Sequence, residues 1–139
     1  MTSSHAARAD FGARCNTIEE AYEFFLAYAS QGLPSDQASA TGQQVRDYLT
    51  RCDAALAGLA EAATALVAQH ELDAAPYRAF LDVIARDASD ARAAIQVVLA
   101  QRAISSQLVD NLNASIHLRA LLTDLFLIDE ALKGAGGQA

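Results

Sequence analysis

The chain has 139 residues, a formal net charge of −7 and a hydrophobic fraction of 53%. This length predicts one domain with a core that needs no metal or disulfide, and the composition excludes a disordered chain. The acidic charge disfavours nucleic acid as a partner, because an acidic surface repels phosphate backbones. No run of about 18 apolar residues is present, so the sequence predicts no insertion into a membrane.

Residues 1–15 carry serine, histidine, alanine and arginine without helical periodicity, and we expect them to form a flexible N-terminal tail. This segment also lacks the apolar core of a signal peptide, which favours a cytoplasmic location. Lys133 is the only lysine, and the other basic residues are arginines. Such an alanine- and arginine-rich composition suggests a GC-rich, bacterial genome.

A first and shorter helix is expected to begin at Asn16 or Thr17, whose side chains can cap a helix N-terminus. An apolar stripe follows at helical spacing. Gly32 followed by Pro34 is typical of a helix C-terminus and predicts the end of this helix.

A second, long helix is expected from Thr41 to about His70, because its apolar residues alternate at spacings of four and three. These residues are Val45, Leu49, Cys52, Leu56, Leu59, Ala63 and Leu66. A second stripe holds only small side chains, at Ala54, Gly58, Ala62 and Ala65. A glycine inside a helix costs about 1 kcal/mol relative to alanine, so we expect a neighbouring backbone to approach Gly58 closely.

The third helix is expected to start at Pro76, which suits the first turn of a helix. Its apolar stripe has the same spacing and contains Tyr77, Leu81, Ile84, Ala88, Ala91, Ile95 and Val98. No glycine or proline separates it from a fourth helix that Gly134 ends. Equal helix lengths favour a turn between Ala103 and Ser106, and the alternative is a turn near Asn113.

These stripes must be buried against other helices, so the sequence predicts an all-α fold. The expected architecture is an antiparallel four-helix bundle with a shorter first helix and three long ones. The bundle domain is expected to span residues 16–133, followed by a flexible C-terminal tail at residues 134–139.

A search for chemistry gives no catalytic residue, no metal site and no cofactor, because no nucleophile motif, phosphate-binding loop or metal-ligand spacing is present. His117, Asp110, Asn113 and Asp124 share one helix face and are interpreted as a polar face rather than a weak metal site. Cys15 lies at the end of the predicted tail, where an exposed thiol is one interpretation.

One polar constellation indicates a possible ligand pocket in the bundle core. Asn111, Ser115 and Arg119 recur every four residues on a face that also carries leucines. Together with Arg102, Arg119 would hold an anionic ligand or a carboxylate of a partner. The alternative is structural: Arg119 reaches solvent, Ser115 is small, and Asn111 bonds locally.

Residues 118–132 are apolar on nearly every side, which predicts that this helix is either central to the fold or covered by another subunit. The expected interface residues are Leu118, Leu122, Leu125, Phe126 and Ile128. The sequence therefore favours a non-enzymatic cytoplasmic interaction, accessory or scaffolding protein that forms a homodimer. The alternatives are a small-ligand-binding or sensor bundle around Asn111, Ser115 and Arg119, and a small all-α enzyme that uses Arg119 and Arg102.

Overall fold

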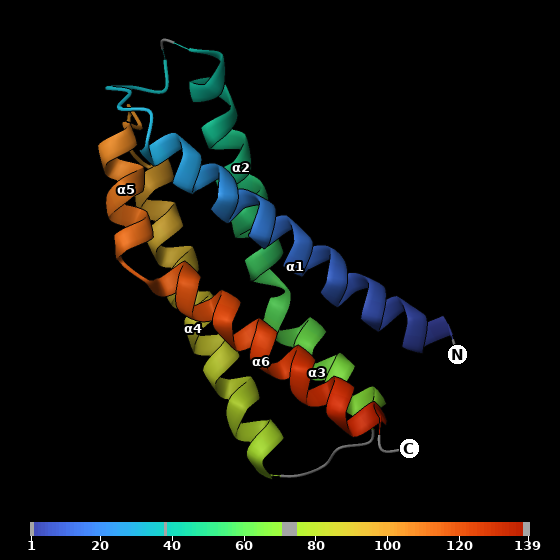
Figure 1. The fold of residues 1–139 in the computed structure, drawn as a ribbon. Coiled ribbons are helices and arrows are strands. Elements are labelled where there is room, and N and C mark those ends of the chain that lie inside the picture. Colours follow the sequence, from blue (N-terminus) through green and yellow to red (C-terminus); the bar gives the residue numbers. More distant parts are fainter. Residues whose placement is uncertain (1, 38, 71–74, 138–139) are drawn as a thin grey trace.

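The computed structural model describes residues 2–37, 39–70 and 75–137, and this part of the chain is entirely helical apart from turns and connections. It contains six helices: α1 (Thr2–Ala29), α2 (Ala40–Ala57), α3 (Leu59–Gln69), α4 (Ala75–Leu99), α5 (Ser106–Ala114) and α6 (His117–Gly137). Figure 1 shows that α3 continues the path of α2 and that α6 continues the path of α5. The N- and C-terminal ends lie at the same end of this elongated molecule (Figure 1).

The core lies between α1, the α2–α3 pair, α4 and the α5–α6 pair. α1 packs against both pairs, and α4 packs against both from the opposite side. The predicted stripe of the second helix is buried throughout, from Val45 to Leu66. The stripe of α4 is buried from Ile84 to Val98. The spacing of apolar residues therefore predicted the core-facing sides of both segments correctly.

The first helix differs most from the prediction. It begins at Thr2 and has 28 residues, so the expected start at Asn16 or Thr17 and the expectation of a shorter first helix are both wrong. Phe11 explains the extension, because this single aromatic side chain is buried in the core. The helical segment therefore includes residues 2–15, which were expected to be a tail, whereas residue 1 lies outside the described residues.

The predicted second helix is divided at Gly58, where α2 ends and α3 begins. Arg14 of α1 fills this break: its Nη1 donates to the carbonyl oxygens of Ala54 at 3.3 Å and Ala55 at 3.1 Å. Carbonyls at a helix C-terminus have no hydrogen-bond donor within the helix, and here the guanidinium of Arg14 is that donor. A Cβ on Gly58 would lie 2.7 Å from the Arg14 Cζ atom. The close neighbour of Gly58 is thus an arginine side chain and not the expected backbone.

The predicted fourth helix is also divided. A turn follows α4, and Ser105 caps α5 by accepting a 3.0 Å hydrogen bond from the Leu108 N–H, which confirms the predicted break near Ser106. A second break at Ile116 separates α5 from α6, close to the alternative position near Asn113. The four-helix bundle with three long helices is therefore not confirmed. α6 also runs past Gly134 to Gly137, and residues 138–139 of the expected C-terminal tail lie outside the described residues.

A buried carboxylate joins three segments at the other end of the molecule. Asp36, between α1 and α2, accepts the Ile104 N–H at Oδ1 and the Arg46 Nε–H at Oδ2, both at 2.7 Å. Arg46 then donates to the carbonyl oxygens of Leu99 at 3.2 Å and Gln101 at 2.8 Å, after the last turn of α4. A Cβ at Gly42 would overlap the Asp36 backbone, so α2 can pack this closely only with glycine there.

The first prediction concerns the pairing of Arg14 with Gly58. Gly58→Ala should lower the free energy of unfolding by about 1–2 kcal/mol, because the new Cβ displaces a guanidinium whose hydrogen bonds outweigh the helix propensity of alanine. In an Arg14→Ala background the same substitution should be neutral or stabilising. Urea denaturation of the four proteins of this double-mutant cycle measures the difference, and additive effects would contradict it.

The second prediction concerns Asp36. Burial alone raises the pKa of Asp36, but the hydrogen bonds from Ile104 and Arg46 outweigh it and hold the pKa below 3.8. The ionised form therefore stabilises the fold above this pH, and its contribution is lost as the pH falls through the lower folded-state pKa. Asp36→Ala should cost about 3 kcal/mol at neutral pH, because Arg46 and the Ile104 N–H lose their acceptor.

Urea denaturation at neutral and strongly acidic pH provides the measurement. The difference between wild type and Asp36→Ala should shrink in acid. Asp47→Ala is the matched control, because Asp47 is exposed on the neighbouring helix α2 and pairs with Arg51 only across one turn. An equal cost for both substitutions at neutral pH would contradict the role of Asp36.

Candidate functional site

Asn111 and Ser115 lie one turn apart at the end of α5, where the Ser115 N–H donates to the Asn111 carbonyl oxygen at 3.0 Å, whereas Arg119 and Arg102 lie on other segments. Asn111 is exposed on α5 and accepts a 3.3 Å hydrogen bond from Gln107. Ser115 donates to the Leu112 carbonyl oxygen at 2.6 Å and so closes the end of α5. Arg119 is exposed on α6, after the helix break that interrupts the four-residue spacing. Arg102 is exposed in the connection between α4 and α5.

The predicted interface residues divide into two groups. Leu118, Leu122, Leu125 and Ile128 are buried within the chain itself, because α6 packs them against α4 and α1. Phe126 has 57% of its surface exposed. Of the five, only Phe126 is therefore accessible to a partner without opening the core.

Two adjoining grooves separate α1 from α6, and together with Leu26 and Ile116 we call them the α1–α6 face. The first has a volume of about 340 Å³ and is lined by Glu19, Tyr22, Glu23, Arg119, Leu122, Thr123 and Phe126. The second has a volume of about 260 Å³ and is lined by Phe11, Gly12, Cys15, Asn16, Glu19, Leu125, Phe126 and Asp129. They share Glu19 and Phe126, so Phe126 stands between them as an apolar ridge.

Ile116 stands at the end of α6 nearest Arg119, where it has a backbone φ of 65° and an exposed fraction of 58%. A β-branched residue at positive φ is a steric outlier, whereas glycine or asparagine adopts this conformation readily. Leu26 is 47% exposed on α1, one turn beyond Tyr22 and Glu23. A 3.2 Å hydrogen bond from Asn113 to the Phe25 carbonyl oxygen joins the end of α5 to this turn.

Cys15 lies in the second groove but is not the exposed, reactive thiol that its position in the sequence suggested. It is half-buried, and burial followed by the nearby charges of Glu19 and Asp129 raises its pKa to about 12. Because the thiolate is the nucleophilic form, a thiol with this pKa is inert at neutral pH.

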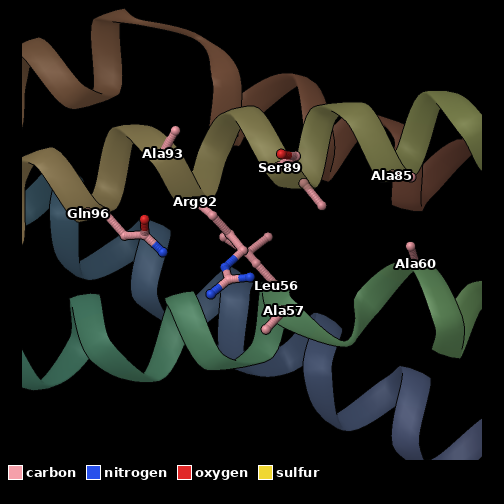
Figure 2. Close-up of a pocket in the computed structure, with 9 residues that line it drawn as sticks. Leu56, Ala57, Ala60, Ala85, Ser89, Arg92, Ala93 and Gln96 are labelled. Atoms are coloured by element: carbon pink, nitrogen blue, oxygen red, sulfur yellow. The ribbon is translucent and has the colours of Figure 1, made fainter.

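A different groove separates the α2–α3 pair from α4, and we call it the Arg92 groove. Its volume is about 280 Å³, and its lining is Leu56, Ala57, Ala60, Ala85, Ala88, Ser89, Arg92, Ala93 and Gln96. Figure 2 shows the Arg92 guanidinium in the gap between the two ribbons, beside Leu56 and Ala57. Its Nε donates to Asp53 Oδ1 at 2.9 Å, and the same oxygen lies 3.4 Å from Gln96 Nε2.

Sequence reasoning missed the Arg92 groove. Ser89, Arg92 and Gln96 recur at spacings of three and four among alanines, which is a signal of a polar line on an otherwise small-residue surface. The partner Asp53 lies on another helix, so the ion pair has no local signature in the sequence.

Two aspartates meet between α4 and α6. Burial, followed by the hydrogen bond and the charge of Asp87, raises the pKa of Asp124 to about 7. The Oδ2 atom of Asp124 is buried and has no hydrogen-bond partner. Asp124 therefore faces α4 and not Asp110 or Asn113 of α5, with which it was grouped as a polar face.

No three histidine, cysteine, aspartate or glutamate residues gather into a metal-binding group within the described ranges. In the same ranges, no helix is both long and apolar enough to cross a membrane. No family model, curated protein or solved structure matches the chain. A functional assignment therefore has to come from the chemistry of these surfaces.

The third prediction concerns the Asp87–Asp124 pair. The unfolded-state pKa of Asp124 is close to 3.8 and the folded-state value is about 7, so between these values the folded state keeps a proton that the unfolded state has lost. The free energy of unfolding should therefore fall as the pH rises through this window. Asp124→Asn should remove this part of the pH dependence and stabilise the protein above the window by about 1–2 kcal/mol, after allowance for solvent screening.

Urea denaturation of wild type and Asp124→Asn across the window measures this effect. Asp90→Asn is the matched control, because Asp90 is exposed on the same α4 helix as Asp87. If the control flattened the profile as much as Asp124→Asn, general charge repulsion and not the buried pair would be responsible.

Proposed function

We propose that the chain is a non-enzymatic interaction module that forms a homodimer through the α1–α6 face. The observation that supports this most is Ile116, an exposed isoleucine in a left-handed backbone conformation. An isolated monomer would gain stability from asparagine or glycine at this position. A partner that covers the side chain gives a physical reason for isoleucine.

The α1–α6 face carries more exposed apolar surface than Ile116 alone. Phe126 and Leu26 are both about half exposed and lie on α6 and α1. Beneath them Leu122 and Leu125 form an apolar floor that is already part of the core. An aromatic ridge between two shallow grooves fits the features of a protein interface, where buried aromatic anchors contribute most of the binding energy.

The charges of this face favour a second copy of the chain as the partner. α1 contributes the carboxylates of Glu19 and Glu23, whereas α6 contributes the guanidinium of Arg119 in the first groove and the carboxylate of Asp129 in the second. A two-fold axis places α1 of one protomer against α6 of the other. Each acidic α1 edge then meets an arginine of the partner, and Phe126 of each copy fills a groove of the other.

The two sequence-derived alternatives find less support. Asn111, Ser115 and Arg119 bond locally or face solvent, and they do not converge on a pocket. Arg102 and Arg119 are both exposed and lie outside the lumen that the enzyme hypothesis requires.

The fourth prediction tests the dimer by sedimentation velocity over a range of protein concentrations. Wild type should dimerise, and Phe126→Glu should weaken the dimer at least tenfold by placing a charge in an apolar contact. Ile116→Asn should weaken the dimer while stabilising the monomer by about 1 kcal/mol, because asparagine relieves the strained backbone. If Ile116 had only a structural role, Ile116→Asn would not both weaken the dimer and stabilise the monomer.

Val97→Glu is the matched control. Val97 is 61% exposed on α4, away from the α1–α6 face, and the substitution adds the same charge. A monomeric wild type at every concentration would overturn the homodimer. Equal dissociation by Val97→Glu and Phe126→Glu would show that charge and not this face governs association.

A further inference from the structure

The Arg92 groove combines an oriented guanidinium with an apolar wall. Of the Arg92 nitrogens only Nε donates to Asp53, and within the described part of the chain Nη1 and Nη2 have no hydrogen bond. The ion pair restrains the guanidinium through Nε alone, and 37% of the Arg92 side chain is exposed. Figure 2 shows these nitrogens in the space between α4 and the α2–α3 pair.

The wall of the groove is made of small side chains. Ala57 and Ala60 lie on either side of the break at Gly58, and Ala85, Ala88 and Ala93 line the groove from α4. Because no longer side chain fills this space, a volume of about 280 Å³ stays open. This size is close to the lower end of small-molecule sites, which are about 300 Å³ or more.

We propose that the Arg92 groove binds a small monocarboxylic acid with an aliphatic chain. The carboxylate accepts two parallel hydrogen bonds from Nη1 and Nη2, which is the geometry that arginine offers to carboxylates. The aliphatic chain lies on the alanines, where it leaves water. Ser89, one turn before Arg92 on α4, supplies a hydroxyl beside the carboxylate.

The chemistry of the site selects this class over other anions. Asp53 repels any second anion at Arg92, and this repulsion is larger for a doubly charged phosphate than for a single carboxylate. A sugar or nucleoside would leave its hydroxyl groups against alanine without partners. The site shares no lining residue with the α1–α6 face, so the inference is independent of the proposed homodimer.

The test uses octanoate below its micelle concentration as the probe, with isothermal titration calorimetry and amide chemical shifts as readouts. Saturable binding with shifts confined to residues of the Arg92 groove is expected. Arg92→Gln should weaken binding at least tenfold, because it removes a charge-assisted pair of hydrogen bonds. Ala85→Leu should weaken it similarly by filling the groove, and leucine suits this exposed helical position.

Arg86→Gln is the matched control, because Arg86 is exposed on the same helix and does not line the groove. It should leave octanoate affinity unchanged. Acetate has the carboxylate without the long aliphatic chain, and octanol has the chain without the carboxylate. Both should bind at least tenfold more weakly than octanoate. If Arg92→Gln fails to fold, the octanoate affinities of Ala85→Leu and Ala93→Leu are compared with that of the wild type instead.

Three results would overturn the proposal. Octanoate affinity that Ala85→Leu leaves unchanged would place the ligand elsewhere. If acetate bound as tightly as octanoate, the aliphatic chain would contribute nothing to the affinity. If octanol bound as tightly, the carboxylate and therefore Arg92 would contribute nothing.

Discussion

The ion pair between Asp36 and Arg46 is the interaction on which the arrangement of the helices depends most. Burying a carboxylate is costly unless it is paired and hydrogen-bonded, and here both oxygens have strong donors at 2.7 Å. The same arginine supplies donors to the carbonyls that follow α4. One buried charge thereby fixes the start of α2, the end of α4 and the approach to α5 relative to one another.

Tyr28 and Ser106 extend this junction to α1. The Tyr28 hydroxyl donates to the Ile104 carbonyl oxygen at 2.7 Å, and Ser106 donates to the Tyr28 carbonyl oxygen at 2.6 Å. Because these groups are buried, each needs its partner, and together they allow only one register of α1 against α5. Both surfaces discussed above lie between elements that this junction positions.

The sequence predicted what depends on apolar spacing and local capping. The buried sides of Leu49 and Ile95 follow from spacing alone, and the break at Ser105 follows from a serine that can cap a helix. Asp36 and Arg92 could not be predicted in this way. Asp36 pairs with Arg46 10 residues away and with the Ile104 N–H 68 residues away, and Arg92 pairs with Asp53 39 residues away. A lone charged residue in a sequence is interpreted as solvated. The role of Phe11 was missed because a single buried residue does not produce a periodic pattern in the sequence.

The helix breaks explain why the two candidate surfaces lie where they do. An uninterrupted second helix with alanine at position 58 would leave no place for Arg14 and would give no offset between Ala57 and Ala60 at the Arg92 groove. An uninterrupted fourth helix would bring Ile116 into a regular helical conformation. The low helix propensity of glycine favours the break at Gly58, whereas isoleucine at the positive φ of the second break is costly. Departures of this kind are expected at functional positions, since stability alone would remove them. The breaks at Gly58 and Ile116 therefore lie beside two of the surfaces that have room for a partner or a ligand.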